Sequence, residues 1–175
     1  ERHKQSGAWI SGSKLVYPPK EKSLNKEEDT NNIKDNFENM AGAWRNTIQF
    51  GGSSWVETHS SSGTVSLNPI HHRRFAAADD LLSNCDKPTS HVTGALHIWN
   101  LEKFISLGGL NPSLSRNFQD IDICLKALQA GSAPMYLGKD MYFYHDESYN
   151  FYSNRNETKY DLQTRSDNVL FNKIW

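Results

Sequence analysis

The chain has 175 residues, the size of one domain, and its 19 Lys and Arg against 20 Asp and Glu give a formal net charge of −1. This balance argues against nucleic acid as a main partner, because nucleic-acid-binding domains carry a clustered basic excess. No apolar run approaches the roughly 20 residues of a membrane helix, and the aromatic content of 11% is too high for a disordered chain. Because the first residue is Glu1, we expect the chain to begin inside a longer protein.

The first half of the chain alternates short apolar segments with long polar ones. Residues 7–17 have the β-branched and aromatic content of a strand. We predict a polar loop over 20–40, with a short helix near 33–40, and strand or turn over 41–56. Residues 57–74 are rich in Ser and are predicted to form a second polar loop, of a length that is often functional.

The second half is more regular and has an α/β pattern. We expect in order a buried strand, two helices, two short strands and a closing helix, at 91–99, 101–107, 120–130, 135–138, 141–145 and 159–175. The helix at 120–130 has the clearest signal, because Ile121, Cys124, Leu125 and Leu128 follow the i, i+3, i+4, i+7 pattern. Neither GxGxxG nor a P-loop is present, so a nucleotide would not be held in those ways.

The residues best suited to chemistry are Asp120 and Asp122 at the start of this helix and His145 at the end of a predicted strand. A carboxylate at a helix start is held rigidly and faces out of the helix end, which suits a general base. A His with a neutral ring nitrogen can bind a metal. The two acids could equally cap the helix and the His could be an ordinary edge-strand residue, so both interpretations stay open.

Several motifs occur in a fixed order: V-T-G-A at 92–95, G-G-L-N-P at 108–112, N-F-Q-D-I-D-I-C-L-K at 117–126, A-G at 130–131 and Y-H-D-E-S at 144–148. In order and spacing they resemble the C-terminal half of the catalytic domain of the family-2 inverting glycosyltransferases. Weaker matches lie at 12–18, at 48–52 and in the closing helix, with Asp167, Phe171 and Trp175. The resemblance implies a partial GT-A (nucleotide-diphospho-sugar transferase) fold, in which a mixed sheet is flanked by helices and the N-terminal nucleotide-binding strands are missing.

The resemblance also implies roles for two of these residues. Asp120 matches the general base that deprotonates the acceptor hydroxyl, so that the sugar carbon is attacked in line with the leaving nucleotide. His145 matches the residue that helps to hold a divalent metal, Mn or Mg, which neutralises the diphosphate leaving group. On this basis 91–148 is the acceptor and catalytic-base region of a chain that forms one domain or a fragment of one.

Four further residues are expected to bind donor or acceptor. Thr93 and Gly94 match the strand that runs beside the donor sugar, where a missing side chain leaves room. Gln119 stands where Glu or Asn is usual in the family. Asp122 matches a frequent family acid, which we interpret as support for the helix start rather than as a reacting group.

The resulting expectation is an enzyme of polysaccharide biosynthesis that transfers a sugar from a nucleotide-sugar donor, with inversion, to a glycan, lipid-linked or protein hydroxyl. Nucleic acid is not an expected partner. A homodimer through an exposed sheet edge is a hypothesis. Because Cys85 and Cys124 suggest free thiols, we expect a cytoplasmic location, which includes the membrane periphery.

Two other functions remain open. The family's acidic D-x-D motif is not found, and Asp79-Asp80 follows a polar loop rather than a buried strand, so the chain could be a non-catalytic half-domain that serves as a binding or structural module. A metal-dependent hydrolase that uses Asp120, Asp122 and His145 is the other alternative.

Two polar or aromatic groups have a functional and a structural interpretation. The basic run at 71–74 could contact a phosphate-bearing acceptor, but a solvated loop is favoured. The aromatic side chains Trp44, Trp55 and Trp99 could stack on sugar faces, but core packing is favoured.

Overall fold

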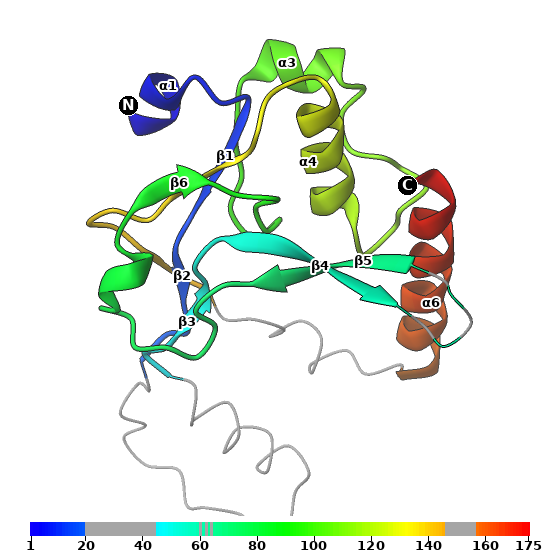
Figure 1. Cartoon of the computed structure of the whole chain (residues 1–175), viewed down its shortest axis with the longest axis horizontal. Coiled ribbons are helices and arrows are strands. Elements are labelled where there is room, and N and C mark those ends of the chain that lie inside the picture. The colour runs from blue at the N-terminus through cyan, green and yellow to red at the C-terminus, as the bar shows by residue number, and fades with distance from the viewer. Residues whose placement is uncertain (20–44, 60, 62, 64, 146–156) are drawn as a thin grey trace, which may run out of the picture.

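The computed structural model describes residues 1–19, 45–59, 61, 63, 65–145 and 157–175, and its architecture is α/β (Figure 1). In chain order its elements are α1 (Arg2–Ser6), β1 (Ile10–Ser13), β2 (Leu15–Val16), β3 (Ile48–Phe50), β4 (Ser53–His59), β5 (Val65–His71), the 3-10 helix η1 (Leu81–Ser83), β6 (Asp86–Pro88), β7 (Ile98–Trp99), α3 (Leu101–Ser106), α4 (Gln119–Gln129), β8 (Met135–Leu137), β9 (Phe143–Tyr144) and α6 (Glu157–Ile174). This confirms the predicted class, in which helices flank a mixed sheet.

The strands of the described residues form two small mixed sheets and a hairpin. The first sheet has the order β6-β8-β1-β7, with β1 parallel to β8 and antiparallel to β7. The second has the order β3-β2-β9, with β2 parallel to β9 and antiparallel to β3. The segment predicted as one strand over 7–17 therefore divides at Lys14 into β1 and β2, which pair in different sheets.

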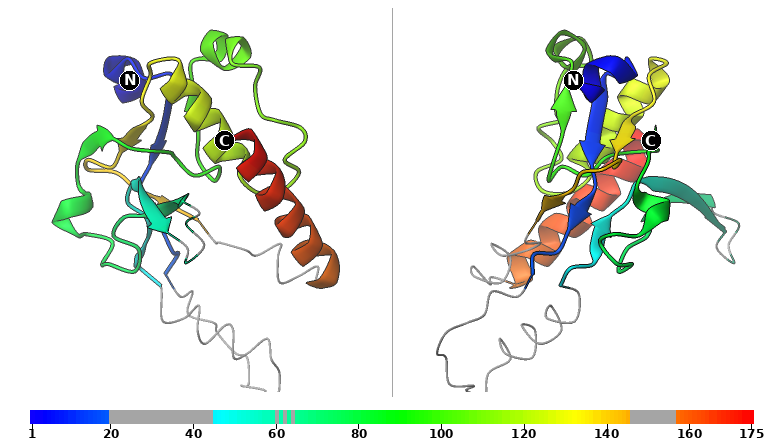
Figure 2. Two further views of the ribbon diagram at one scale, coloured as in Figure 1. Left: turned by 45° about the vertical axis from the view of Figure 1, so that its right-hand side comes forward. Right: turned by 90° about the vertical axis from the view of Figure 1, so that its left-hand side faces the viewer.

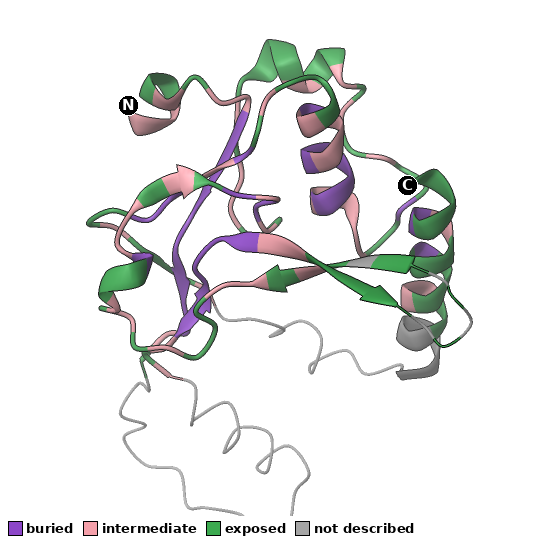
Figure 3. Cartoon of the chain, in the orientation of Figure 1, coloured by how far each residue is buried: buried purple, intermediate pink, exposed green. Residues whose placement is uncertain are grey.

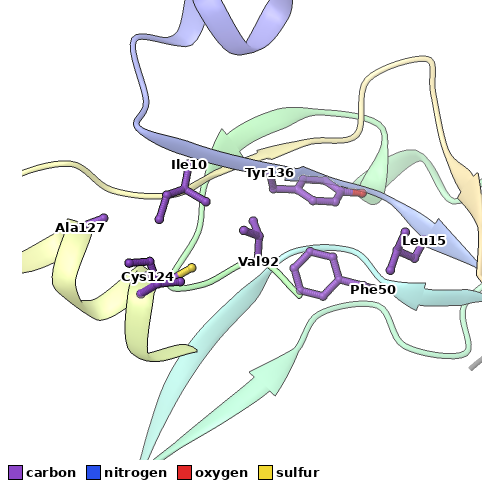
Figure 4. Packing of buried hydrophobic residues seen from close by; sticks show 8 residues of the cluster. Ile10, Leu15, Phe50, Val92, Cys124, Ala127 and Tyr136 are labelled. Carbon is purple, nitrogen blue, oxygen red and sulfur yellow. The ribbon is translucent and has the colours of Figure 1, made fainter. Parts of the chain in front are cut away.

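The hydrophobic core lies where α4 packs against the first sheet. Cys124 and Ala127 of α4 lie on the side of Ile10 of β1, and Val92 lies between them and the pair formed by Tyr136 and Phe50 (Figure 4). Burial follows the same line, because β1, β2, β3 and one face of α4 are buried while most of the hairpin is exposed (Figure 3). The core thus fixes α4, and with it the start of that helix, against β1.

Gly12 of β1 is required by close packing. A Cβ at this position would lie 2.8 Å from the Cβ of Val92 and 2.9 Å from the carbonyl oxygen of Leu96. We expect Gly12→Ala to lower the free energy of unfolding by about 2 kcal/mol, because the crowded neighbours must shift, and urea denaturation measures this. Gly94→Ala is the control, since its Cβ would meet nothing closer than 3.5 Å; equal midpoints for the two variants would contradict the expectation.

The predicted loop over 57–74 was wrong, because β4 and β5 form a hairpin through this segment. Seven residue pairs, from Ser53 opposite His71 to His59 opposite Val65, define its register. The hairpin extends away from the helices in the side view (Figure 2). Its strands mix polar residues with exposed apolar ones such as Val56, Val65 and Ile70, and backbone pairing holds them together whatever the composition. The Ser-rich composition of 57–74 therefore concealed β5 and the end of β4.

The predicted strand over 91–99 was also largely wrong, since only Ile98–Trp99 pairs with β1. The backbone turns at 94–95, where the amide of Leu96 donates to the carbonyl of Thr93 over 3.2 Å. Upstream of this turn, side chains satisfy the backbone: the hydroxyl of Ser53 accepts from the amide of His91 and donates to its carbonyl. These side-chain partners replace a strand ladder.

The three helices predicted in the second half are confirmed as α3, α4 and α6, with ends within two residues of those expected. Asn100 caps α3 by accepting from the amide of Lys103 over 3.1 Å, as its position predicted. The sequence had not indicated α1 or β6. The predictions for 20–40 and for Trp44 lie outside the described residues. No described helix is both long enough and apolar enough to cross a membrane.

Candidate functional site

Asp120 stands in the first turn of α4 and contacts the turn that carries Gly94. Its Oδ2 accepts from the amide of Gly94 over 2.8 Å, and its Oδ1 accepts from the amide of Ile121 over 2.9 Å. The side chain is half-buried, so these bonds fix its orientation while part of it stays accessible. The first turn of a helix also favours a negative charge, because the unpaired N–H groups and the helix dipole face it.

Gly94, which the resemblance placed beside the donor sugar, is thus brought to Asp120, with Thr93 next to it in the chain. Gly94 is exposed, and a Cβ there would lie 3.5 Å from Oδ2 of Asp120. The absent side chain leaves this face of the carboxylate open. Because the two residues are 26 positions apart, the contact depends on the tertiary fold.

Gln119 and Asp122 are engaged within the protein. The amide nitrogen of Gln119 donates to the carbonyl of Leu114 and closes the loop that leads into α4. Asp122 is fully buried: its Oδ1 accepts from the indole Nε1 of Trp175 over 2.9 Å, and its Oδ2 forms an ion pair with Nζ of Lys126 at 2.8 Å, outside the angular range of a hydrogen bond. This placement agrees with the interpretation of Asp122 as support for the helix start.

His145 follows β9 and is held by the second sheet. Its amide donates to the carbonyl of Val16 over 3.0 Å, and its Nδ1 lies 2.7 Å from Oε1 of Gln49. Because a carbonyl oxygen can only accept, Nδ1 donates this bond, and Nε2 is the ring nitrogen that could bind a metal when the ring is neutral. A hydrogen bond of this kind orients metal-binding histidines in many proteins. The role of Gln49 was not predicted, although it lies in the weak I-Q-F-G-G match.

The expected metal would thus have a candidate nitrogen ligand, Nε2 of His145. Across the part of the chain that the structure describes, no group of three or more His, Cys, Asp or Glu side chains is placed to hold a metal ion. The neighbouring Asp146 and Glu147 lie outside that part. The contacts that hold His145 come from β2 and β3, whereas those that hold Asp120 come from α4 and the turn at Gly94.

The sequence did not single out His91, which lies close enough to Asp120 for the charge of that carboxylate to affect its pKa. Burial, and secondly the nearby His71, lower the pKa of His91 to about 4, although the charge of Asp120 acts in the opposite direction. Nε2 of His97 donates to the carbonyl of Val92 over 2.9 Å, and burial lowers the pKa of His97 too. Both rings are therefore neutral near pH 7.

The remaining candidates have structural partners. Within the basic run, Arg73 forms two bonds with Asp80, at 2.9 and 2.6 Å, and Arg74 donates to the hydroxyl of Tyr17 over 3.0 Å. Trp55 packs against the cluster of Leu114, Ile121 and Phe171, and Trp99 packs against the core. For these two Trp residues the structure shows core packing, which was the favoured interpretation.

No family model, no curated protein and no solved structure matches this chain.

Proposed function

We propose that this chain is the acceptor-side, C-terminal part of an inverting glycosyltransferase of family 2 with the GT-A fold, and that Asp120 is its general base. The observation that carries the proposal is the Asp120–Gly94 bond of 2.8 Å, which joins the two motifs of the resemblance at one accessible carboxylate. The α/β architecture supports the proposed fold.

The geometry suits proton removal from a hydroxyl. An acceptor hydroxyl placed at the open face of Asp120 would give its proton to a carboxylate oxygen as its own oxygen attacks the sugar carbon. The bond between that carbon and the diphosphate breaks on the opposite side, and the nucleoside diphosphate leaves with the electron pair, which inverts the carbon. The bonds from Gly94 and Ile121 hold the base in place, so the base has less orientational freedom to lose in reaching the transition state.

A divalent metal, Mn or Mg, would neutralise the charge that develops on the diphosphate. His145 fits this group through the free lone pair of Nε2, and an imidazole ligand suits Mn better than Mg, which prefers oxygen. Donor phosphate oxygens would complete the ligand set. The free thiols Cys85 and Cys124 support a cytoplasmic enzyme, and the membrane periphery remains part of that proposal.

His145→Ala is expected to raise the concentration of Mn needed for half-maximal transfer by about tenfold, because one ligand and its oriented lone pair are lost. A metal titration of the initial rate measures this. Gln49→Ala removes only the orienting bond and should give a smaller increase. An unchanged metal requirement in His145→Ala would remove His145 from the metal site.

The proposed function is tested by assaying the full-length protein that contains this chain with a panel of nucleotide sugars and hydroxyl acceptors. We expect transfer from one donor, with inversion at the sugar carbon. Retention of configuration, or the absence of transfer with every donor, would contradict the proposal. Release of free sugar without transfer would instead favour the hydrolase that uses Asp120, Asp122 and His145.

The second candidate is a non-catalytic module, favoured because the family's acidic D-x-D motif, which binds metal and diphosphate, is not found in the sequence. Such a module would bind a glycan but not a nucleotide sugar. Calorimetry separates the two functions: glycan binding with no donor binding or turnover in the full-length protein would establish the module.

A further inference from the structure

The closing helix α6 contacts the segment that carries Asp120 at three separate levels. The C-terminal end of α6 lies beside α4 in both orientations (Figures 1 and 2). At the first level, the buried carboxylate of Asp167 accepts from the amides of Ser115, Arg116 and Asn117, over 3.3, 2.8 and 2.9 Å. The side-chain amide of Asn117 also donates to Oγ1 of Thr164 over 3.0 Å. The loop before α4 is thus tied to α6 through its backbone.

The second level is an aromatic stack at the residue where α4 begins. Phe118 precedes the helix with φ 66°, in the left-handed region that a bulky side chain rarely adopts. Its ring stacks on that of Phe171 at 4.7 Å between centroids and 19° between planes. A strained backbone persists only where its surroundings hold it, at a cost of about 1–3 kcal/mol. The stack on α6 is the contact that holds this one.

The third level lies at Asp122, four residues after Phe118 and still in the first turn of α4. The indole of Trp175 donates to Oδ1 of Asp122, which is fully buried and two residues from Asp120. Lys126, one turn later on α4, faces the other oxygen of the same carboxylate. Trp175 therefore fixes the first turn of α4 from the side opposite the Gly94 turn.

We propose that α6 positions Asp120, and that Phe171 and Trp175 act as positioning residues for this carboxylate. The three contacts determine where the first turn of α4 starts, and that start determines whether Oδ2 of Asp120 reaches the amide of Gly94. The role of Asp120 as a general base rests on the proposed function. The coupling between α6 and the Asp120–Gly94 bond does not.

The test measures that bond directly, in the full chain labelled with ¹⁵N. A hydrogen bond to a carboxylate moves the Gly94 amide resonance and slows its exchange with solvent, and Asp120→Asn marks how far both depend on the charge of the acceptor. We expect Trp175→Phe and Phe171→Leu to move the Gly94 resonance toward the Asp120→Asn position and to speed exchange on the order of fivefold, the size of one weakened hydrogen bond. Trp175→Phe keeps a six-membered aromatic ring and removes the N–H donor together with the five-membered ring that carries it.

Two controls separate positioning from stability. Ile48→Val removes a buried methyl group from β3, which makes none of the three contacts, and Val169→Ala changes an exposed site on α6. Both should leave the Gly94 amide unchanged. A Gly94 amide that is unchanged in the folded Trp175→Phe variant, or changed equally by Ile48→Val, would overturn the proposal.

Activity gives a second readout that keeps the two proposals apart. In a transferring enzyme, Trp175→Phe should lower kcat while the KM for the donor stays the same, because only the orientation of the base changes. If the Gly94 amide responds but no transfer is ever observed, the coupling stands and only the base role fails. If transfer occurs but the amide does not respond, the base role stands and the coupling fails.

Discussion

Replacement of Asp120 by Asn in the proposed transferase is expected to lower the rate of transfer about a thousandfold, the usual size of a general-base contribution. The Asn oxygen can still accept from the amide of Gly94, so the local geometry should survive while the basic group is lost. Single-turnover and steady-state rates measure the loss. Circular dichroism and the unfolding midpoint should stay close to those of the original protein, because no buried contact is removed.

Glu102→Gln provides the matched control for this substitution. Glu102 also lies in the first turn of a helix, α3, and is exposed. Glu102→Gln removes one negative charge from the first turn of a helix, as Asp120→Asn does, so a general electrostatic effect would appear in both variants. We expect full activity for Glu102→Gln. Turnover in Asp120→Asn that stays within about tenfold of the original rate would be too small a loss for a general base and would remove that assignment.

Asp167→Ala is expected to lower the free energy of unfolding by about 3 kcal/mol, the largest effect on stability that we foresee. The side chain is 1% exposed and accepts from three backbone amides and from Nε2 of Gln163. Its removal takes away the buried acceptor that these amides share. Urea denaturation gives the size of the loss, and Ser166→Ala, an exposed change on the same helix, should stay within about 0.5 kcal/mol.

The same carboxylate predicts how stability depends on pH. Burial opposes the charged form of Asp167, but the bonds from Asn117, Arg116, Gln163 and Ser115 outweigh it, and the pKa is lowered from 3.8. A lowered pKa means that the folded state binds the proton more weakly than the unfolded chain does. The stabilisation is therefore complete above pH 3.8 and is lost as the pH falls toward the lower folded pKa.

His91 produces an earlier loss of stability over a different range. Its pKa falls from 6.5 to about 4 in the folded protein, so the unfolded chain takes up a proton first and stability declines between those values. Asp167→Asn should therefore keep the loss of stability that His91 causes above pH 4, and it should lack the loss that Asp167 causes below pH 3.8. A stability difference between Asp167→Asn and the original chain that stayed constant down to low pH would contradict this account.

How far the sequence could predict the candidate site differs from residue to residue. Asp120 was found because a helix start is a local feature that an acid before an apolar periodic run reveals. His145 was singled out by its place at the end of a predicted strand and by the resemblance, but its partner Gln49 lies 96 residues away, so no local pattern could connect them. His91 was missed because its interest comes from burial and neighbouring rings, and neither can be read from a single residue in a predicted strand.

The hairpin shows why composition alone can mislead. Its strands Ser53–His59 and Val65–His71 are mostly exposed and mix polar with apolar residues, and backbone pairing joins segments that composition treats as separate. The segment at 91–97 is the opposite case, because its alternating pattern favours a strand but Ser53 and the turn at Gly94 take up its backbone groups.

The sequence by itself determined the α/β class, α4 with Asp120 in its first turn, and α6, because each depends on periodicity and caps within a few neighbouring residues. The tertiary structure alone decided that Gly94 meets Asp120, that Asp122 is buried against Trp175, and that Asp167 holds the loop before α4. Those contacts join residues from 26 to 53 positions apart. They form only when the core between α4 and β1 has brought the segments together, so no local rule predicts them.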